Sequence, residues 1–381
     1  MGRSFHGVGT LDAQRRFAEQ LMDTVTQENV DVVLLAGDVY DRALPGVDVV
    51  NLFDDILARL SAAGVPVVIT SGNHDSATRL GFGGRIMERA GVHLRTRVAD
   101  LDTPVLLPLS NDADASDAGQ LAIYGIPFLE PRLVADELGV DEPSHFTVTE
   151  AAVKRIHADL AGRAEGTVAV VLAHTFASGG ITSASERELA IGGVGAVPLD
   201  LFDDFAYTAL GHLHGRQKLS ETVRYSGSPL PYSFSEAAHR KGAWLVDVGP
   251  DGIRDVTAVQ WPAERALSIL RGRLEDLLTG EQWAAMEDDF CQVTLTDDDR
   301  PHQAMERLRA RFPNTLVLLF EPENGREKSS QSYSDRVAGA ANELELCCGF
   351  LDHVRQRAAN DDEQQALRDT LAAVRAREAA L

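Results

Sequence analysis

The strongest constraint on the fold is an alternation of amphipathic helical segments with apolar strands in the N-terminal half of the chain. Residues 11–29 place Phe17, Leu21 and Val25 on one helical face, and VDVVLLAGD then has the pattern of a buried strand that ends at a glycine. The unit repeats, with a helical pattern over residues 49–62 and the apolar strand VPVVITSGNHD. Helices that alternate with strands predict an α/β fold built on a parallel sheet.

Three more apolar strands are expected at residues 121–126, 167–173 and 205–210, and the last two run directly into turns that contain histidine. The small, polar residues 110–120 predict a surface loop between two hairpin strands. Ligand sites of open α/β sheets gather beyond the carboxyl ends of the strands. We therefore expect the functional site at these turns.

The C-terminal third has a different pattern. Residues 265–278 have helical spacing, the strand FCQVTLT follows, and a helix over residues 301–312 leads to the strand TLVLLF. This pattern predicts a small α+β domain, and the chain favours helix from residue 334 onward. The predicted parts are a large domain, a small domain, a linker and a helical tail, over residues 1–262, 263–322, 323–333 and 334–381.

Charge and cysteine content limit the function classes. Lys and Arg total 36 against 58 Asp and Glu, so the formal charge of -22 disfavours tight nonspecific binding of nucleic acid through the surface field alone. If the substrate is DNA, metals or a partner must help. Cys291, Cys347 and Cys348 form no CxxC pair and predict a reducing compartment. No stretch approaches the ~20 apolar residues of a membrane span, so we expect a cytoplasmic protein with no membrane partner.

Four polar clusters stand at the ends of predicted strands: GDVYD, GNHD, AHT and GHLH. Each alone has an ordinary explanation, since Gly-Asp and Gly-Asn are common turn pairs and a lone histidine is often a buried core residue. The turn explanation does not require histidines, however. Asp, Asn and His together are ligands that divalent transition ions accept, so the joint occurrence of the clusters predicts a metal site.

The residue types in these clusters suit phosphoester hydrolysis. Asp38 can bridge two ions through its two carboxylate oxygens, and two ions ~4 Å apart can bind both a water and a phosphate oxygen. His74 is the candidate general acid, and Asp75 is expected to orient its ring and raise its pKa. His212 and His214 would point to opposite sides of an extended strand, or reach two neighbouring ions from a tight turn, and their spacing leaves both arrangements open.

In this order, the four clusters resemble the motifs of calcineurin-like metallophosphoesterases. That resemblance implies a two-sheet β-sandwich flanked by helices and a dinuclear metal site. The segments GRSFHG and RYSGSPLPYSFSE, with the small C-terminal domain, resemble more narrowly the nuclease subunits of SbcCD complexes, which work with a coiled-coil ATPase. The ligands of two Mn²⁺ ions implied by position are Asp38 as the bridge, Asn73, His174 and His212 on one ion, and His214 on the other.

The same resemblance implies partners. DNA would be the substrate, the small domain would help to position it, and the subunit would form a homodimer within a heterotetramer. The C-terminal helices would dock on the ATPase coiled coil, through an apolar stripe that alternatively packs on its own chain: Leu344, Leu346, Phe350, Leu351 and Val354. The segment from Tyr225 through Ser226 and Gly227 to Ser228 follows the metal-binding turn, and a strand-turn-strand with no catalytic role is its alternative reading.

The chain departs from the family pattern at its start. The family opens with a strand and an Asp-x-His motif that supplies two ligands to the first metal, whereas here Met1 stands directly before GRSFHG. Asp38 and His214 are then the remaining ligands of that metal, and His6 is not assigned as a replacement. A misplaced start codon is the favoured explanation over a trimmed chain or a genuine variant. A domain without its first strand is expected to be less stable.

Three functions follow as hypotheses. The leading one is a Mn²⁺-dependent DNA nuclease subunit, acting as exonuclease and endonuclease in DNA repair, recombination and replication. The second is a metallophosphodiesterase of small substrates such as cyclic nucleotides, against which the small second domain and the helical tail argue. The third is a non-catalytic scaffold subunit with an incomplete metal site.

Overall fold

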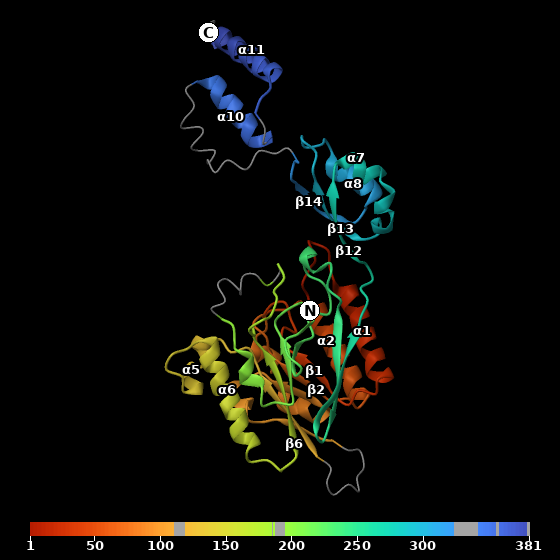
Figure 1. Cartoon of the computed structure of the whole chain (residues 1–381), viewed down its shortest axis with the longest axis vertical. Helices are drawn as coiled ribbons and strands as arrows, with labels where there is room; N and C mark the ends of the chain where they lie inside the picture. Colours follow the sequence, from red (N-terminus) through yellow and green to blue (C-terminus); the bar gives the residue numbers. More distant parts are fainter. Residues whose placement is uncertain (110–118, 185, 187–194, 324–341, 356–357, 379–381) are drawn as a thin grey trace. The chain divides into compact units, whose positions relative to one another are not determined.

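The computed structural model describes residues 1–109, 119–184, 186, 195–323, 342–355 and 358–378. Residues 110–118 of the predicted loop and 324–333 of the predicted linker lie outside this set. The chain divides into two compact units, Met1–Glu264 and Arg265–Leu381 (Figure 1).

The first unit begins with a small parallel sheet covered by two helices. The sheet has the order β1-β2-β3, with β1 (Val33–Ala36), β2 (Val67–Thr70) and β3 (Val92–Arg95). The helices are α1 (Leu11–Gln27) and α2 (Val47–Ala62), and short helices α3 (Ala77–Leu80) and α4 (Gly84–Met87) precede β3. Leu21 of α1 and Ile56 of α2 are buried against Ile69 of β2. The predicted helices and strands of this region are therefore present.

A second, larger sheet has the order β4-β5-β6-β7-β9-β8. Its strands are β4 (Val105–Pro108), β5 (Gln120–Ile126), β6 (Thr167–His174), β7 (Tyr207–Gly211), β8 (Gln217–Lys218) and β9 (Val223–Tyr225). The central strands are parallel, and β4 and β8 pair antiparallel at the two edges. Helices α5 (Pro131–Leu138) and α6 (His145–Leu160) follow β5, and Ser144 opens α6 with a capping box to Thr147.

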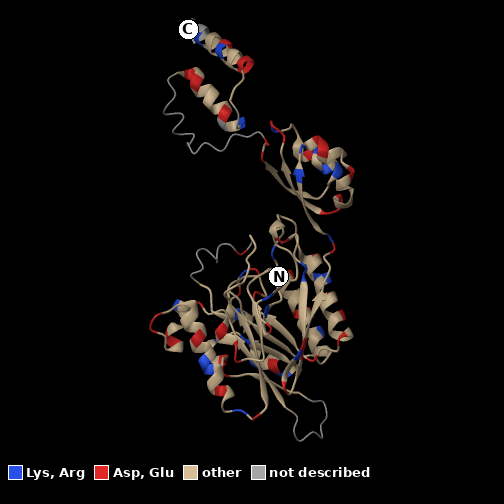
Figure 2. Cartoon of the chain, viewed as in Figure 1, with Lys and Arg blue, Asp and Glu red and all other residues tan. Residues whose placement is uncertain are grey.

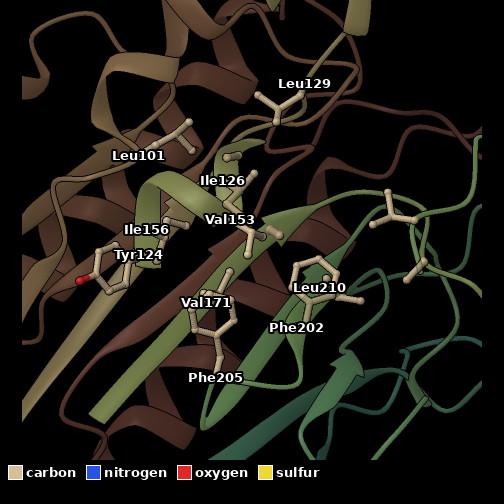
Figure 3. Packing of buried hydrophobic residues seen from close by; sticks show 14 of the residues in the cluster. Leu101, Tyr124, Ile126, Leu129, Val153, Ile156, Val171, Phe202, Phe205 and Leu210 are labelled. Atoms are coloured by element: carbon tan, nitrogen blue, oxygen red, sulfur yellow. The ribbon is translucent and has the colours of Figure 1, made fainter. Parts of the chain in front are cut away.

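Strand β6 explains how the layers pack. Val170 and Leu172 point into the core between the two sheets, whereas Val171 points to the outer core under the helices. Figure 3 shows this outer core, in which Val171 lies among the side chains of Val153 and Ile156. A strand buried on both faces is expected to be almost continuously apolar, and β6 is apolar from Val168 to Ala173. The unit is a helix-sheet-sheet-helix sandwich, and the predicted α/β sandwich flanked by helices is confirmed.

A hairpin of β10 (Gly242–Gly249) and β11 (Gly252–Gln260) completes the first unit. Val246 and Val248 of β10 pack on the core between the sheets. Figure 2 shows that charged residues of this unit gather on helices and loops, while its central strands are mostly uncharged.

The second unit contains a parallel sheet of the order β12-β13-β14. Its elements are β12 (Leu267–Gly272), α7 (Leu274–Thr279), β13 (Phe290–Leu295), α8 (Ala304–Arg311) and β14 (Thr315–Phe320). The prediction of one helix over residues 265–278 is wrong. Leu267, Leu270 and Leu274 have helical spacing, but residues 267–272 each pair with β13, and this pairing prevails over the local pattern.

Two further helices, α10 (Glu343–Arg355) and α11 (Asp361–Glu378), contact each other. The apolar stripe predicted on α10 is divided. Leu344 and Leu351 are half-buried, whereas Leu346, Phe350 and Val354 are exposed. Within the described part of the chain, no helix has the length and apolar character needed to cross a membrane.

Candidate metal centre

Four strand ends from the two sheets deliver the predicted ligands to one place. Asp38 follows β1, Asn73 follows β2, His174 is the last residue of β6, and His212 comes directly after β7. The carboxyl ends of β1 and of β6 and β7 approach each other because these strands contact across the sandwich. The fold therefore brings together side chains that are far apart in the sequence.

The donor atoms of these residues form a tight group. His174 Nε2 lies 3.0 Å from Asn73 Oδ1 and 3.4 Å from Asp38 Oδ2. His212 Nδ1 lies 3.1 Å from Asn73 Oδ1 and 3.3 Å from His174 Nε2. Two ligands at right angles on one ion, each with a bond of about 2.1 Å, are about 3 Å apart. The observed spacing is that of a single coordination shell, and the three ionisable members lie within 4.8 Å of one another.

Hydrogen bonding leaves this group with more acceptors than donors. His174 Nδ1 donates to the carbonyl oxygen of Ala36 at 2.7 Å, because a carbonyl can only accept. In the neutral ring, Nε2 then presents a lone pair to the oxygens of Asp38 and Asn73. Either an added proton or a cation must relieve this crowding of lone pairs, and a divalent cation fits the donor set.

The electrostatics of the group are those of a cation site. Burial alone would raise the pKa of Asp38, but the charge and hydrogen bond of His174 hold that pKa well below its usual range. Burial would lower the pKa of the His174 ring, but the charge and the hydrogen bond of Asp38 outweigh this effect and raise that pKa. Burial, with the nearby charge of His174, lowers the pKa of His212 to about 3, so its ring is a neutral ligand at ordinary pH.

Backbone geometry at the site is unusual. Asp38 has φ 49 and His212 has φ 113, in a region that residues other than glycine rarely adopt. Two glycines also permit close approach: a Cβ on Gly37 would lie 2.3 Å from His174 Nδ1, and one on Gly72 would lie 2.1 Å from Asp38 Oδ1. The glycines of GDVYD and GNHD are thus part of the packing of the site.

His74 stands beside the cluster with a fixed ring. Its Nδ1 donates to the carbonyl oxygen of Asp41 at 2.9 Å, and its backbone N–H donates to Asp38 Oδ1 at 3.0 Å. The bond to Asp41 leaves Nε2 as the ring atom available for proton transfer. The ring lines a cavity that Asp38 and His212 also line.

Asp75 has a different place from the one expected. Its carboxylate accepts the backbone N–H groups of Val39, Tyr40 and Gly72 at 3.1, 2.9 and 2.9 Å. Among the described residues it makes no hydrogen bond to the ring of His74, so the expectation that Asp75 orients that ring is wrong. A side chain that satisfies three N–H groups on two loops instead ties the GDVYD loop to the GNHD loop.

His214 lies outside the cluster of Asp38, His174 and His212. Its Nδ1 is 3.1 Å from Glu236 Oε1, a partner that sequence reasoning did not identify. Tyr225 has a structural environment, because its hydroxyl donates to the carbonyl oxygen of Thr175 and accepts the N–H of Ala177. For Tyr225, these contacts favour the reading without a catalytic role.

A cavity of about 860 Å³ adjoins the site. Consecutive residues line it on both sides, residues 29–41 around β1 and residues 242–248 of β10, so strand edges border it. In the described residues, β1 is an edge strand and β10 pairs with β11 alone. Asp38, His212 and His214 lie along this cavity.

Comparison with known proteins identifies the family. The family model for calcineurin-like phosphoesterases matches residues 5–216, more than half of the chain. The chain belongs to this family. As a calcineurin-like phosphoesterase it is a metal-dependent phosphoesterase, and the predictions of its fold class, its enzyme class and its need for divalent metals are confirmed.

The second unit also matches a family model. Residues 264–353 match the type 5 capsule protein repressor C-terminal domain. The phosphoesterase is 29% identical over 323 residues to the SbcD subunit of the nuclease SbcCD from Staphylococcus saprophyticus, covering 84% of this chain and 81% of that protein. It is also similar to the crystal structure of calcineurin-like phosphoesterase YfkN from Bacillus subtilis, with 17% identity, coverage of 56% and 72%, and a TM-score of 0.33. The similarity to the staphylococcal SbcD bears out the narrower of the two resemblances.

Proposed function

We propose that this phosphoesterase is the DNA nuclease subunit of a complex with a coiled-coil ATPase. The observation that carries the proposal is the convergence of Asp38, Asn73, His174 and His212 in a chain similar to the staphylococcal SbcD over most of both lengths. Its roles would lie in DNA repair, recombination and replication.

The four convergent residues would hold one Mn²⁺ ion, and Asp38 with His214 would contribute to a second. Bound Mn²⁺ would neutralise developing phosphate charge and lower the pKa of a water. Asp38 would serve as the bridge, because its carboxylate offers two oxygens. Oδ2 lies 3.4 Å from His174 Nε2, and Oδ1 accepts the backbone N–H of His74. Mn²⁺ is compatible with mixed carboxylate, amide and imidazole ligands.

His74 would be the general acid for the leaving oxygen. The carbonyl of Asp41 fixes the orientation of the His74 ring through Nδ1. The direction in which Nε2 can deliver a proton is therefore fixed as well. Asp75 would act on catalysis indirectly, by holding the two loops that carry Asp38 and His74.

The test of the nuclease proposal compares substrates and counts metals. The purified chain, loaded with Mn²⁺, should bind two ions by elemental mass spectrometry and cleave duplex DNA ends. A cyclic nucleotide should be a poor substrate. Preference for the cyclic nucleotide would support a small-substrate phosphodiesterase, and metal binding without any cleavage would support a scaffold subunit. His212→Ala serves as the control, since it removes one imidazole from the cluster.

The exposed face of α10 is the proposed docking site for the ATPase coiled coil. Leu346, Phe350 and Val354 recur every four residues and are 39%, 51% and 59% exposed. Such spacing suits an apolar helix face that packs on a partner helix. Phe350→Glu should abolish co-purification with the ATPase, whereas Val374→Glu on α11, at a position 48% exposed, should not. Equal binding by both variants would refute this assignment.

A further inference from the structure

Behind His214 lies a buried ion pair that takes no part in the proposed catalytic steps. Lys241 Nζ donates to Glu236 Oε2 at 2.6 Å, and the two residues are 7% and 1% exposed. Glu236 closes the 3₁₀ turn η5 (Phe234–Glu236), within the segment RYSGSPLPYSFSE. A buried pair of this kind gains little net stability, because removing both charges from water costs about as much as their attraction returns.

The pair holds His214 from two sides. Glu236 Oε1 accepts a hydrogen bond from His214 Nδ1 at 3.1 Å, while Lys241 Nζ donates to the carbonyl oxygen of His214 at 2.8 Å. Lys241 also donates to Ser228 Oγ at 2.9 Å. Glu186 accepts the backbone N–H of His214 as well. Both the ring and the backbone of His214 are therefore fixed by buried groups.

This arrangement sets the tautomer of the His214 ring. An ionised carboxylate only accepts hydrogen bonds, so the ring must carry its proton on Nδ1. The lone pair then lies on Nε2, the atom a metal would use. His174 receives the same orientation from the carbonyl of Ala36, but a carboxylate also makes the imidazole a stronger ligand.

We infer that Glu236, held in place by Lys241, is a positioning residue that prepares His214 to bind the second metal ion. The inference rests on the proposed function for the role of His214 as a ligand. The segment RYSGSPLPYSFSE would thus act on metal binding through His214, and Glu236 itself would not need to contact the substrate.

The first experiment reads the tautomer of His214 in the metal-free full-length chain. Histidine ¹⁵N NMR at pH 8, with the signal assigned from the His214→Ala variant, should show the proton on Nδ1. In Glu236→Gln, which keeps the side-chain length, the Nδ1–H form should lose its dominance. Glu221→Gln is the matched control, because Glu221 pairs with Lys218 at the surface and its side chain is 84% exposed. A proton on Nε2 in the wild-type chain would overturn the inference.

Metal binding gives the second readout. Glu236→Gln should weaken the binding of one of the two Mn²⁺ ions by about 10- to 100-fold and leave the affinity for the other ion unchanged. In a His214→Ala background, the same substitution should have no further effect on Mn²⁺ affinity. An equal loss in both backgrounds would mean a general structural role and would overturn the inference. Absence of DNA cleavage with the tautomer as expected would instead count against the nuclease proposal alone.

Discussion

Replacing Gly72 by alanine tests whether close packing of the loops builds the metal site. The added Cβ would lie 2.1 Å from Asp38 Oδ1 and 2.4 Å from the Asp38 backbone nitrogen. Since Cβ atoms essentially never approach other atoms within 3.0 Å, the carboxylate must retreat by about 0.9 Å. No flexible side-chain end can absorb the whole shift, because one of the crowded atoms belongs to the backbone.

The displacement is large compared with what a metal site tolerates. Ligand distances must hold to within about 0.2 Å, and a misplacement of about 1 Å can cost about 100-fold in rate. We therefore expect Gly72→Ala to lose at least about 100-fold in phosphodiester hydrolysis and to bind Mn²⁺ more weakly. Overpacking should also lower the free energy of unfolding by about 1–3 kcal/mol.

The assay pairs calorimetric titration of Mn²⁺ with hydrolysis of an activated phosphodiester, and follows thermal unfolding in the same samples. Gly46→Ala is the control, because a Cβ there meets nothing within 4 Å and the residue has an ordinary φ of -68. If Gly72→Ala binds Mn²⁺ and hydrolyses substrate like Gly46→Ala, the close approach has no part in the site. Loss of stability alone, with full metal affinity, would also refute the reasoning.

Three further outcomes are expected. The His74→Ala variant should keep the Mn²⁺ affinity of the wild-type chain, because the hydrogen bond from residue 74 to Asp38 comes from the backbone N–H. Its cleavage of duplex DNA ends should be slower by about 10²–10⁴-fold. Burial and then Asp289 raise the pKa of Cys291 to about 11, so iodoacetamide at pH 8 should label the half-buried Cys347 and Cys348 first, as peptide mass spectrometry would show. Burial would raise the pKa of Glu236, but His214 and Lys241 lower it from 4.5 to about 2. The wild-type chain should therefore have its full stability advantage over Glu236→Gln above about pH 5 and lose that advantage toward pH 2, as denaturant titrations would show.

Much of the fold could be predicted because pattern and packing agree. The run Val168–Ala173 is apolar throughout, and the strand that contains it is buried on both faces. Residues 265–278 show where pattern fails: a leucine spacing that suits a helix also occurs in a strand followed by a short helix. Periodicity alone does not distinguish the two, since the deciding contacts are with β13, far along the chain.

Less of the site could be predicted. Asp38, Asn73 and His174 were identifiable because strand ends converge in an α/β sheet. The partner of the His74 ring is a backbone carbonyl, that of Asp41, and every residue has one, so the sequence offers no signal for it. Glu236 lies 22 positions after His214, in a segment whose serines and prolines suggest only turns.

The ligand chemistry explains how an acidic chain can act on a phosphodiester. The chain carries a formal charge of -22, which repels DNA at long range. Yet the cluster contains one carboxylate, that of Asp38, and its other donors are an amide and two imidazoles. Divalent ions held by mostly neutral ligands keep most of their positive charge, and in a partly buried site salt screens that charge little. In the proposed function, attraction for the scissile phosphate would come from the ions themselves, and wider contact with a DNA backbone would fall to the proposed ATPase partner.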